Sequence, residues 1–369
     1  MDRRLLRSSL TAAAVAVTAS TALLSPIAPA GAAPRFAVSS VPAGVASGGE
    51  LALDQGRNRL FIADNNDSLR TRGSDFIPSP DPVRPKVEVF DTTTNRPVRS
   101  IDLANQPGGM MMIGGAELIP VKQVPDGLAI DSRRGRVLVT NAHASGITVF
   151  GMDDKRVGPG NLTSLPKSHP MGAVADPATG RFYVGLNGAD KVAVFSSAGR
   201  HIGDIGNLYK ASFLDVDAGR NRLYVGNADY EAKKNNFVAV VDLRTGRVIK
   251  KIPTPSNSRP KVDPTTGRVW AASFDTGKIS IIDPASLRVV RTIDTKTSPS
   301  KIAFDAGRRL AYTANLQKKT ITVLNADSGA IVATLPTGAA VHTVVVDQKT
   351  GIVYGSQHIS GKLTVVRPS

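Results

Sequence analysis

Histidine and carboxylate side chains are the groups in this sequence that could bind a metal ion, and the histidines are few. The chain has 369 residues, with five histidines and no cysteine. Imidazole nitrogens are common metal ligands, and carboxylates can complete such a site. The candidate ligands are Glu50, His169, His342 and His358. No short histidine spacing holds any two of them together, so they are either a site gathered by the fold or unrelated surface residues.

Basic side chains form the second group with chemical potential. Lysine and arginine together number 46 against 30 acidic residues, which gives a net charge of +16. Such a surplus favours anionic partners such as nucleic acid, anionic polymers or acidic surfaces, although it also serves solubility. The candidate ligand-binding residues are Glu50, Asp126, Lys210, Arg259, Lys261, Lys301 and His342. The candidate basic rim consists of Arg70, Arg72, Lys233 and Lys234.

The sequence contains no motif that specifies catalysis or a cofactor. The absence of cysteine excludes disulfides and thiolate metal sites. The glycines of residues 108–115 are not followed by the Gly-Lys-Ser/Thr of a phosphate-binding loop. No nucleophile and base are recognisable as a pair, and a divalent metal is the cofactor for which ligands are available.

A repeat must position these residues. Seven short apolar runs each end in an aspartate, and all the intervals between successive aspartates except the first are 41 to 46 residues long. The aspartates are Asp54, Asp131, Asp176, Asp217, Asp263, Asp305 and Asp347. A period of about 40–45 residues with four strand-like runs is typical of a propeller blade. Because Asp begins tight turns by bonding its own backbone, we expect these seven aspartates to be structural.

Alternating β-branched residues and Gly, Asp and Asn turns predict four strands in each repeat, and no helical period is sustained. The last repeat stops after a third strand at residues 363–366, whereas residues 35–41 form a strand without a repeat. Pairing these two segments would close the ring and remove its open edges. We therefore predict an all-β, seven-bladed propeller of four-stranded antiparallel blades, closed by its N- and C-terminal strands.

Several runs resemble a known repeat. Leu223-Tyr-Val-Gly-Asn227, Val137-Leu-Val-Thr-Asn141 and Ala333-Thr-Leu-Pro-Thr-Gly338 are similar to the tyrosine-valine-threonine-asparagine (YVTN) repeat of secreted bacterial propellers, the YncE-like group. The resemblance spans residues 35–368. It implies an exported seven-bladed, WD40-like propeller, and some relatives are reported to bind nucleic acid or to lie at cell surfaces. The repeat residues are architectural, so the resemblance does not identify a ligand.

The two faces of the predicted ring differ in their loops. Turns from first to second and from third to fourth strands are short, as in residues 176–181 and 263–268, and we call their side the short-turn face. The other loops include the insertions 65–85 and 104–125, and we call their side the elaborated face. Because variable loops on a rigid scaffold usually carry function, we expect the site there, at the mouth of the central channel. Inside the channel, Lys261 is the expected partner of Asp215.

The N-terminus has the features of a signal peptide. Arg3, Arg4 and Arg7 precede an apolar stretch over residues 10–24, and small residues follow at 28–33. We expect residues 1–33 to be removed and residues 34–369 to form one exported domain, monomeric and without a transmembrane segment. The favoured function is a binding scaffold that presents the basic elaborated face to an anionic polymer, nucleic acid or cell-surface protein. The alternative is a metal-dependent enzyme, lactonase- or lyase-like, with its site at the channel mouth.

Overall fold

The computed structural model describes residues 34–64, 69–72, 75–78, 86–103, 109–113, 117–121, 125–230, 232, 234–358 and 360–369. For the strands between residues 69 and 78 and between 109 and 121, it describes the backbone alone. The chain divides into two units, Met1–Arg35 and Phe36–Ser369, and the second contains the fold. The predicted signal peptide, residues 1–33, lies outside the described residues.

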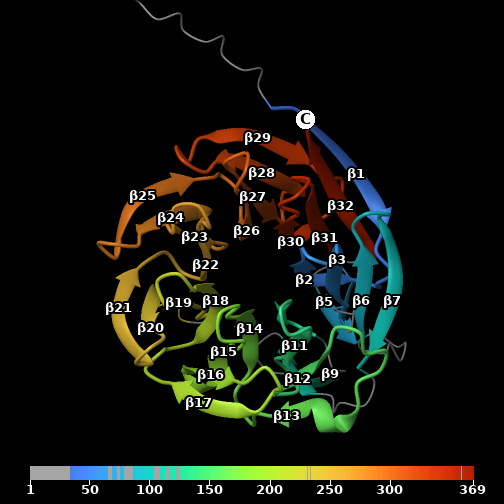
Figure 1. Ribbon diagram of the computed structural model, residues 1–369, viewed down its shortest axis with the longest axis vertical. Coiled ribbons are helices and arrows are strands. Elements are labelled where there is room, and N and C mark those ends of the chain that lie inside the picture. Colours follow the sequence, from blue (N-terminus) through green and yellow to red (C-terminus); the bar gives the residue numbers. More distant parts are fainter. Residues whose placement is uncertain are drawn as a thin grey trace, which may run out of the picture. The chain divides into compact units, whose positions relative to one another are not determined.

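Seven four-stranded antiparallel sheets surround a central channel, which confirms the predicted propeller (Figure 1). Blade 1 contains β2 (Gly48–Asp54), β3 (Arg59–Asp64), β6 (Lys86–Asp91) and β7 (Arg96–Asp102); blade 2 contains β10 (Leu128–Asp131), β11 (Arg136–Asn141), β12 (Gly146–Gly151) and β13 (Leu162–Ser164); blade 3 contains β14 (Pro170–Ala175), β15 (Phe182–Leu186), β16 (Lys191–Phe195) and β17 (His201–Ile205); blade 4 contains β18 (Ala211–Asp217), β19 (Arg222–Asn227), β20 (Phe237–Asp242) and β21 (Arg247–Pro253).

The remaining blades follow the same order. Blade 5 contains β22 (Ser258–Val262), β23 (Val269–Ser273), β24 (Lys278–Asp283) and β25 (Arg288–Asp294); blade 6 contains β26 (Pro299–Asp305), β27 (Leu310–Asn315), β28 (Thr320–Asn325) and β29 (Ile331–Pro336); blade 7 contains β30 (Val341–Val346), β31 (Val353–Gln357), β32 (Lys362–Pro368) and β1 (Phe36–Pro42). Two short 3-10 helices, η1 (Pro159–Asn161) and η2 (Asn187–Ala189), lie in connections.

The core lies between neighbouring blades rather than at the centre of the ring. The second strands carry the largest buried side chains, among them Phe61, Tyr224, Trp270 and Tyr312. Trp270 of blade 5, for example, packs edge-on against Phe304 of blade 6, with ring centroids 5.5 Å apart. Because both faces of these strands are covered by adjacent blades, their side chains are apolar at successive positions instead of alternating with polar ones.

The terminal strands close the ring as predicted. Strand β1 pairs antiparallel with β32 from Phe36 opposite Pro368 to Pro42 opposite Lys362. The Phe36 ring also lies edge-on to Tyr312 of blade 6 at 6.4 Å. The first segment of the propeller therefore supplies the outermost strand of its last blade, and no blade among the described strands is left with three.

The fourth strand of blade 2, which the sequence does not indicate clearly, is the three-residue strand β13. It follows η1, and the chain before η1 instead bridges Asp102 of blade 1 through Arg156. The segment between β12 and β13 thus extends the edge of the neighbouring blade before it returns to its own.

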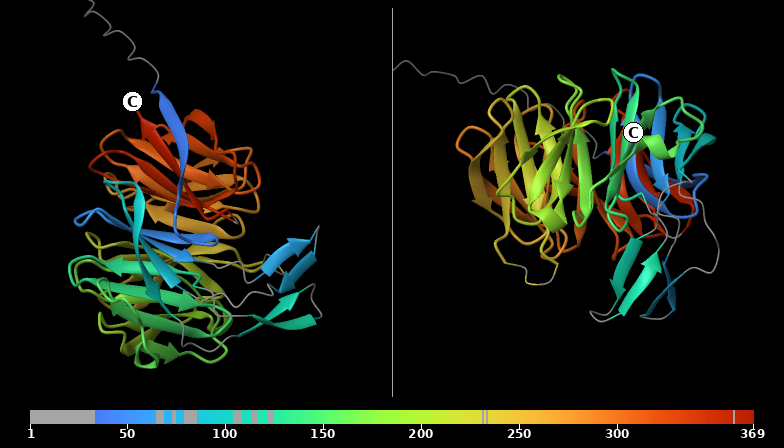
Figure 2. Two further views of the ribbon diagram at one scale, coloured as in Figure 1. Left: turned by 90° about the vertical axis from the view of Figure 1, so that its right-hand side faces the viewer. Right: turned by 90° about the horizontal axis from the view of Figure 1, so that it is seen from below.

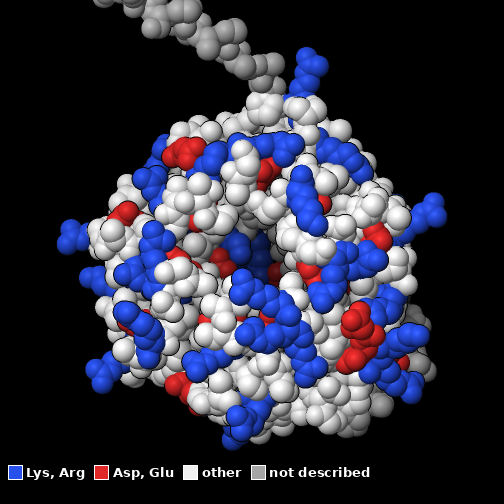
Figure 3. All heavy atoms as spheres, viewed as in Figure 1, with Lys and Arg blue, Asp and Glu red and all other residues white. Residues whose placement is uncertain are grey.

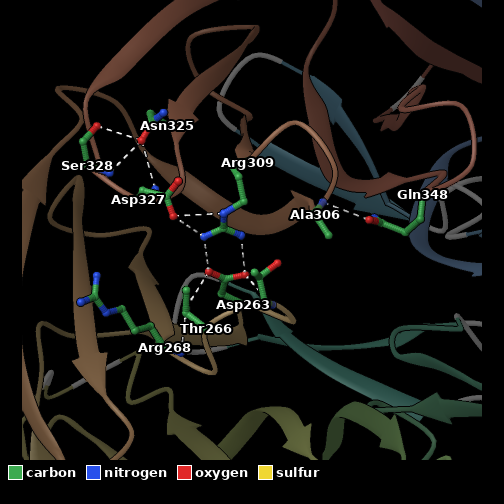
Figure 4. A network of polar contacts seen from close by, with 10 residues as sticks. Asp263, Thr266, Arg268, Ala306, Arg309, Asn325, Asp327, Ser328 and Gln348 are labelled. Atoms are coloured by element: carbon green, nitrogen blue, oxygen red, sulfur yellow. Dashed lines mark hydrogen bonds and ion pairs between the residues drawn. The ribbon is translucent and has the colours of Figure 1, made fainter. Parts of the chain in front are cut away.

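All seven repeat aspartates accept hydrogen bonds from backbone N–H groups of their own turns, so their structural role is confirmed. Some also join blades. Arg309, in the β26–β27 turn of blade 6, donates to both carboxylate oxygens of Asp263 in blade 5 at 3.1 and 2.8 Å, and to Asp327 at 2.7 Å (Figure 4). Bidentate pairs of this kind fix the relative position of two blades.

The insertions fold into two hairpins on one side of the ring. Strands β4 (Leu69–Arg72) and β5 (Asp75–Pro78) form one, and β8 (Gly109–Ile113) and β9 (Glu117–Val121) form the other. Figure 2 shows both projecting from the same face, the elaborated face of the sequence analysis. Figures 1 and 3 look onto the opposite, short-turn face.

Candidate ligand site in the central channel

The inner strand of every blade lines a channel cavity of about 690 Å³. The cavity extends from Glu50, Arg259 and Lys301 at the elaborated end to Gln55 and Gln348 at the short-turn end. Figure 3 shows the short-turn face hollowed at its centre, with charged side chains in the depth. A volume of this size suits a small molecule, since ligand cavities typically measure about 300–1,000 Å³.

Two of the predicted residues form an ion pair at the elaborated end of the channel. Lys301 Nζ lies 2.5 Å from Glu50 Oε2, and the Thr343 hydroxyl lies 3.4 Å from Glu50 Oε1. The three residues come from blades 6, 1 and 7, so the pair spans three neighbouring inner strands. The Glu50 and Lys301 charges thereby compensate one another.

A second pair lies deeper. Lys261 Nζ is 3.2 Å from Asp215 Oδ1, and the other oxygen of Asp215 accepts the backbone N–H of Val262 at 2.7 Å. This confirms the predicted partnership and explains how a carboxylate can stand within an otherwise apolar strand. A buried charge is tolerable when it is paired and hydrogen-bonded.

Arg259 differs from both lysines. Its guanidinium carbon lies 4.3 Å from the centre of the Phe213 ring and 5.8 Å from that of Phe274. Its Nε is buried without an acceptor, and the guanidinium makes no hydrogen bond or ion pair with any residue that the structure describes. Burial lowers the pKa of Arg259, although Tyr230, Glu50 and Asp275 act in the opposite direction. The Arg259 guanidinium therefore packs on aromatic rings, and its hydrogen-bond donors are available to an anion.

The predicted histidines separate into two pairs. The rings of His342 and His358 lie 6.5 Å apart in blade 7, whereas His169 lies 5.5 Å from His143. Burial lowers the pKa of His342 to about 4, and burial and His169 lower that of His143 to about 4. Within the described ranges, no three His, Asp or Glu side chains gather so that they could hold a metal ion. Glu50, His169, His342 and His358 thus form no common ligand set there.

Two other predicted residues, Asp126 and Lys210, lie just before the inner strands β10 and β18. Asp126 accepts the backbone N–H of Ala142 at 2.8 Å, and the carbonyl of Lys210 lies 3.4 Å from Asn187 Nδ2. Neither lines the channel cavity. In the predicted rim, Lys234 is exposed. Arg70 and Arg72 belong to β4, whose side chains are outside the described part, and Lys233 is itself outside it.

Replacing Asp126 with Asn should stabilise the protein at high pH. Burial raises the pKa of Asp126 to about 7, against the opposing hydrogen bond from Ala142. Between about pH 4 and 7 the unfolded chain has lost this proton and the folded one retains it, so the free energy of unfolding falls as pH rises. We expect Asp126→Asn to gain roughly 1–3 kcal/mol at pH 8 and almost nothing at pH 4.

Denaturant unfolding at the two pH values measures this difference. Asp153→Asn is the control, because it makes the same substitution at a side chain that is 94% exposed. An equal effect of Asp126→Asn at both pH values would contradict the assignment.

Sequence reasoning overlooked the aromatic support of Arg259. Phe213 occupies the position four residues before a repeat aspartate, and Arg259 occupies the same position in the next blade. Alignment of the seven runs on their aspartates places the two side by side, so the signal was present in the repeat.

Comparison with known proteins agrees with the fold. No protein-family model matches the chain. The chain is 24% identical to "Uncharacterized protein YncE" of Salmonella typhi over 246 residues. This aligned region covers 65% of this chain and 56% of that protein. It is 26% identical over 194 residues to the protein of the same name from Escherichia coli K12, covering 53% and 42%. The chain spans about half the length of the curated relatives it matches.

A solved structure extends the comparison. Hydrazine synthase of Kuenenia stuttgartiensis superposes with a TM-score of 0.64 over 89% of this chain and 97% of that one, at 15% identity. At this identity the likeness concerns the fold alone. No helix among the described residues is long and apolar enough to cross a membrane. The similarity to YncE and the seven four-stranded blades together support a YncE-like β-propeller.

Proposed function

We propose that the protein is an exported binding scaffold whose elaborated face takes an anionic polymer. The observation that carries this proposal is a set of exposed lysines on three loops of that face. These lysines are Lys167, Lys234, Lys318 and Lys319. None of them forms an ion pair with another residue in the described ranges. On the short-turn face, Arg57, Arg134, Arg220 and Arg308 are each paired with a repeat aspartate, which reduces the charge that these four arginines present to a partner.

Two further features support a role in binding. Both hairpin insertions lie on the elaborated face (Figure 2), which enlarges the surface that a long partner could contact. Tyr230, on the β19–β20 loop of the same face, is 52% exposed and offers an aromatic ring beside Lys234 in the sequence. The alternative, a metal-dependent reaction at the channel mouth, would require a ligand set there, and the described residues gather no three His, Asp or Glu side chains that could hold a metal ion.

Reversing two of these lysines should weaken polymer binding. On single-stranded nucleic acid, each phosphate contact contributes about 0.7 to the steepness of log K against log salt, because bound counterions are released. For a single-stranded oligothymidylate of 20 nucleotides, we expect Lys234→Glu with Lys318→Glu to lower affinity at least about tenfold and to reduce that slope by 1–2. Fluorescence anisotropy over a series of salt concentrations measures both quantities.

The matched control reverses Arg247 and Lys250, which are exposed on the outer strand β21. It makes the same change in net charge away from the proposed face. If both double variants weaken binding equally, the effect is one of net charge and the proposal fails. Polyglutamate as a second probe distinguishes recognition of phosphate from recognition of anionic polymers in general.

A further inference from the structure

The channel mouth is asymmetric at one position of the repeat. Four residues before each aspartate, the seven inner strands carry Glu50, Gly127, Gly172, Phe213, Arg259, Lys301 and Thr343. Blades 2 and 3 thus contribute glycines, whereas blades 4 to 6 contribute an aromatic ring and two cations. The glycines are required sterically, since a Cβ at Gly127 would lie 2.3 Å from the Met171 carbonyl and one at Gly172 would lie 2.7 Å from that of Ser212.

The asymmetry continues along the channel. The lining segments of blades 2 and 3, residues 127–130 and 172–175, contain only glycine and aliphatic residues. Those of blades 4 to 6 include Asp215, Arg259, Lys261 and Lys301. In a ring of seven blades, blade 2 lies opposite blades 5 and 6 (Figure 1). One wall of the cavity is therefore apolar, and the wall facing it is charged.

The charged wall has one cation in excess. Lys301 is compensated by Glu50, Lys261 by Asp215 and Arg220 by Asp217. Asp263, which also lines this wall, is compensated by Arg309. Arg259 is the remaining cation of this wall, and it has no hydrogen-bonded carboxylate among the described residues. Because the Phe213 ring covers one face of its guanidinium, recognition of an anion falls to the edge donors, which match the two oxygens of a carboxylate.

We propose that the channel binds a small apolar monocarboxylate, with its carboxylate on Arg259 and its hydrocarbon part against the wall formed by blades 2 and 3. The single excess charge matches a monoanion, and the opposed apolar wall matches a short aliphatic or aromatic body. The cavity of about 690 Å³ accommodates such a molecule. This site is separate from the lysines proposed to bind polymers, and neither proposal depends on the other.

Calorimetric titration with hexanoate tests the site. Hexanamide is the matched ligand without the charge, and acetate is the ligand without the hydrocarbon body. We expect hexanoate to bind more tightly than both. Equal binding of hexanoate and hexanamide by the unmodified protein would overturn the proposal, and this comparison requires no variant.

Arg259→Met provides the matching variant, because methionine can retain packing on Phe213 while it removes the charge. We expect hexanoate binding to weaken at least about tenfold, as for the loss of one charge-assisted hydrogen bond. Arg247→Met, on the outer strand, is the control and should bind as before. Unchanged hexanoate binding by Arg259→Met would refute the assignment. Oligothymidylate binding should survive Arg259→Met, so failure of this proposal can be distinguished from failure of polymer binding.

Discussion

A chain that begins at Ala43 should be much less stable than one that begins at Pro34. It lacks β1, so β32 becomes an open edge and the blade 7 sheet is reduced to three strands. It also loses the contacts of Phe36 with Tyr312 and of Val41 with the core between blades 7 and 1. Since domains are stable by only about 5–15 kcal/mol in total, we expect a loss of several kcal/mol and aggregation through the exposed edge.

Thermal and denaturant unfolding of the two chains measure this loss, and two substitutions refine it. Val41 is partly buried against the core, whereas Val38, on the same strand, is 37% exposed. We expect Val41→Asp to cost about 2–3 kcal/mol and Val38→Asp less than about 0.5 kcal/mol. Equal melting temperatures for the chains with and without β1 would show that ring closure contributes little to stability.

The architecture was predictable because the repeat specifies it seven times. Each aspartate, turn and apolar run is a weak signal alone, but their common period indicates blades, and the incomplete last repeat indicates the closing strand. The pair of Asp215 and Lys261 was also predictable, because a carboxylate in an apolar strand requires a partner and the matching position of the next blade holds a lysine.

The channel site was less accessible to sequence reasoning. The grouping of Glu50 with Lys301 across blades 1 and 6 depends on closure of the ring, since 251 positions separate the two residues in the chain. The isolation of Arg259 depends on side-chain directions that a strand pattern does not fix. Asp126 and Lys210 lie just before the inner strands of blades 2 and 4, at the predicted end, yet neither lines the cavity. Asp126 accepts the backbone N–H of Ala142 instead.

Charge is likewise not confined to the face that the loops favour. Figure 3 shows many lysine and arginine side chains on the short-turn face. On this face, Arg57, Arg134, Arg220 and Arg308 each follow a repeat aspartate by three residues and form an ion pair with its carboxylate. Net charge therefore overstates the positive surface available to a partner, and the pairing of each side chain has to be considered.

Replacing Arg309 with Met should cause the largest loss of stability expected for a single substitution on the short-turn face. The Asp263 side chain is fully buried, and Arg309 donates to both of its oxygens (Figure 4). Removing one partner of a buried pair leaves an uncompensated charge, which costs about 3–5 kcal/mol. Asp263 retains the hydrogen bonds from Thr265 and Thr266, so we expect about 3 kcal/mol.

The effect should depend on pH in a definite direction. Burial raises the pKa of Asp263, but the hydrogen bonds from Arg309, Thr266 and Thr265 outweigh burial, and the pKa lies below its ordinary value. A lowered pKa stabilises the folded state above about pH 4, the range of the unfolded chain, and this contribution disappears as pH falls through the folded value. The difference between the unmodified protein and Arg309→Met should therefore be full at pH 7 and shrink below about pH 4.

Denaturant unfolding at pH 7 and in the acid range measures this difference, and Arg244→Met is the matched control. Arg244 also pairs with an aspartate that follows a strand, Asp242, but its side chain is 74% exposed. Exposed pairs contribute little to stability, so Arg244→Met should hardly change the free energy of unfolding. Equal losses in the two variants would mean that Arg309 acts through general surface charge. A loss confined to Arg309→Met, and diminished in acid, would show that the link between blades 5 and 6 depends on the buried carboxylate.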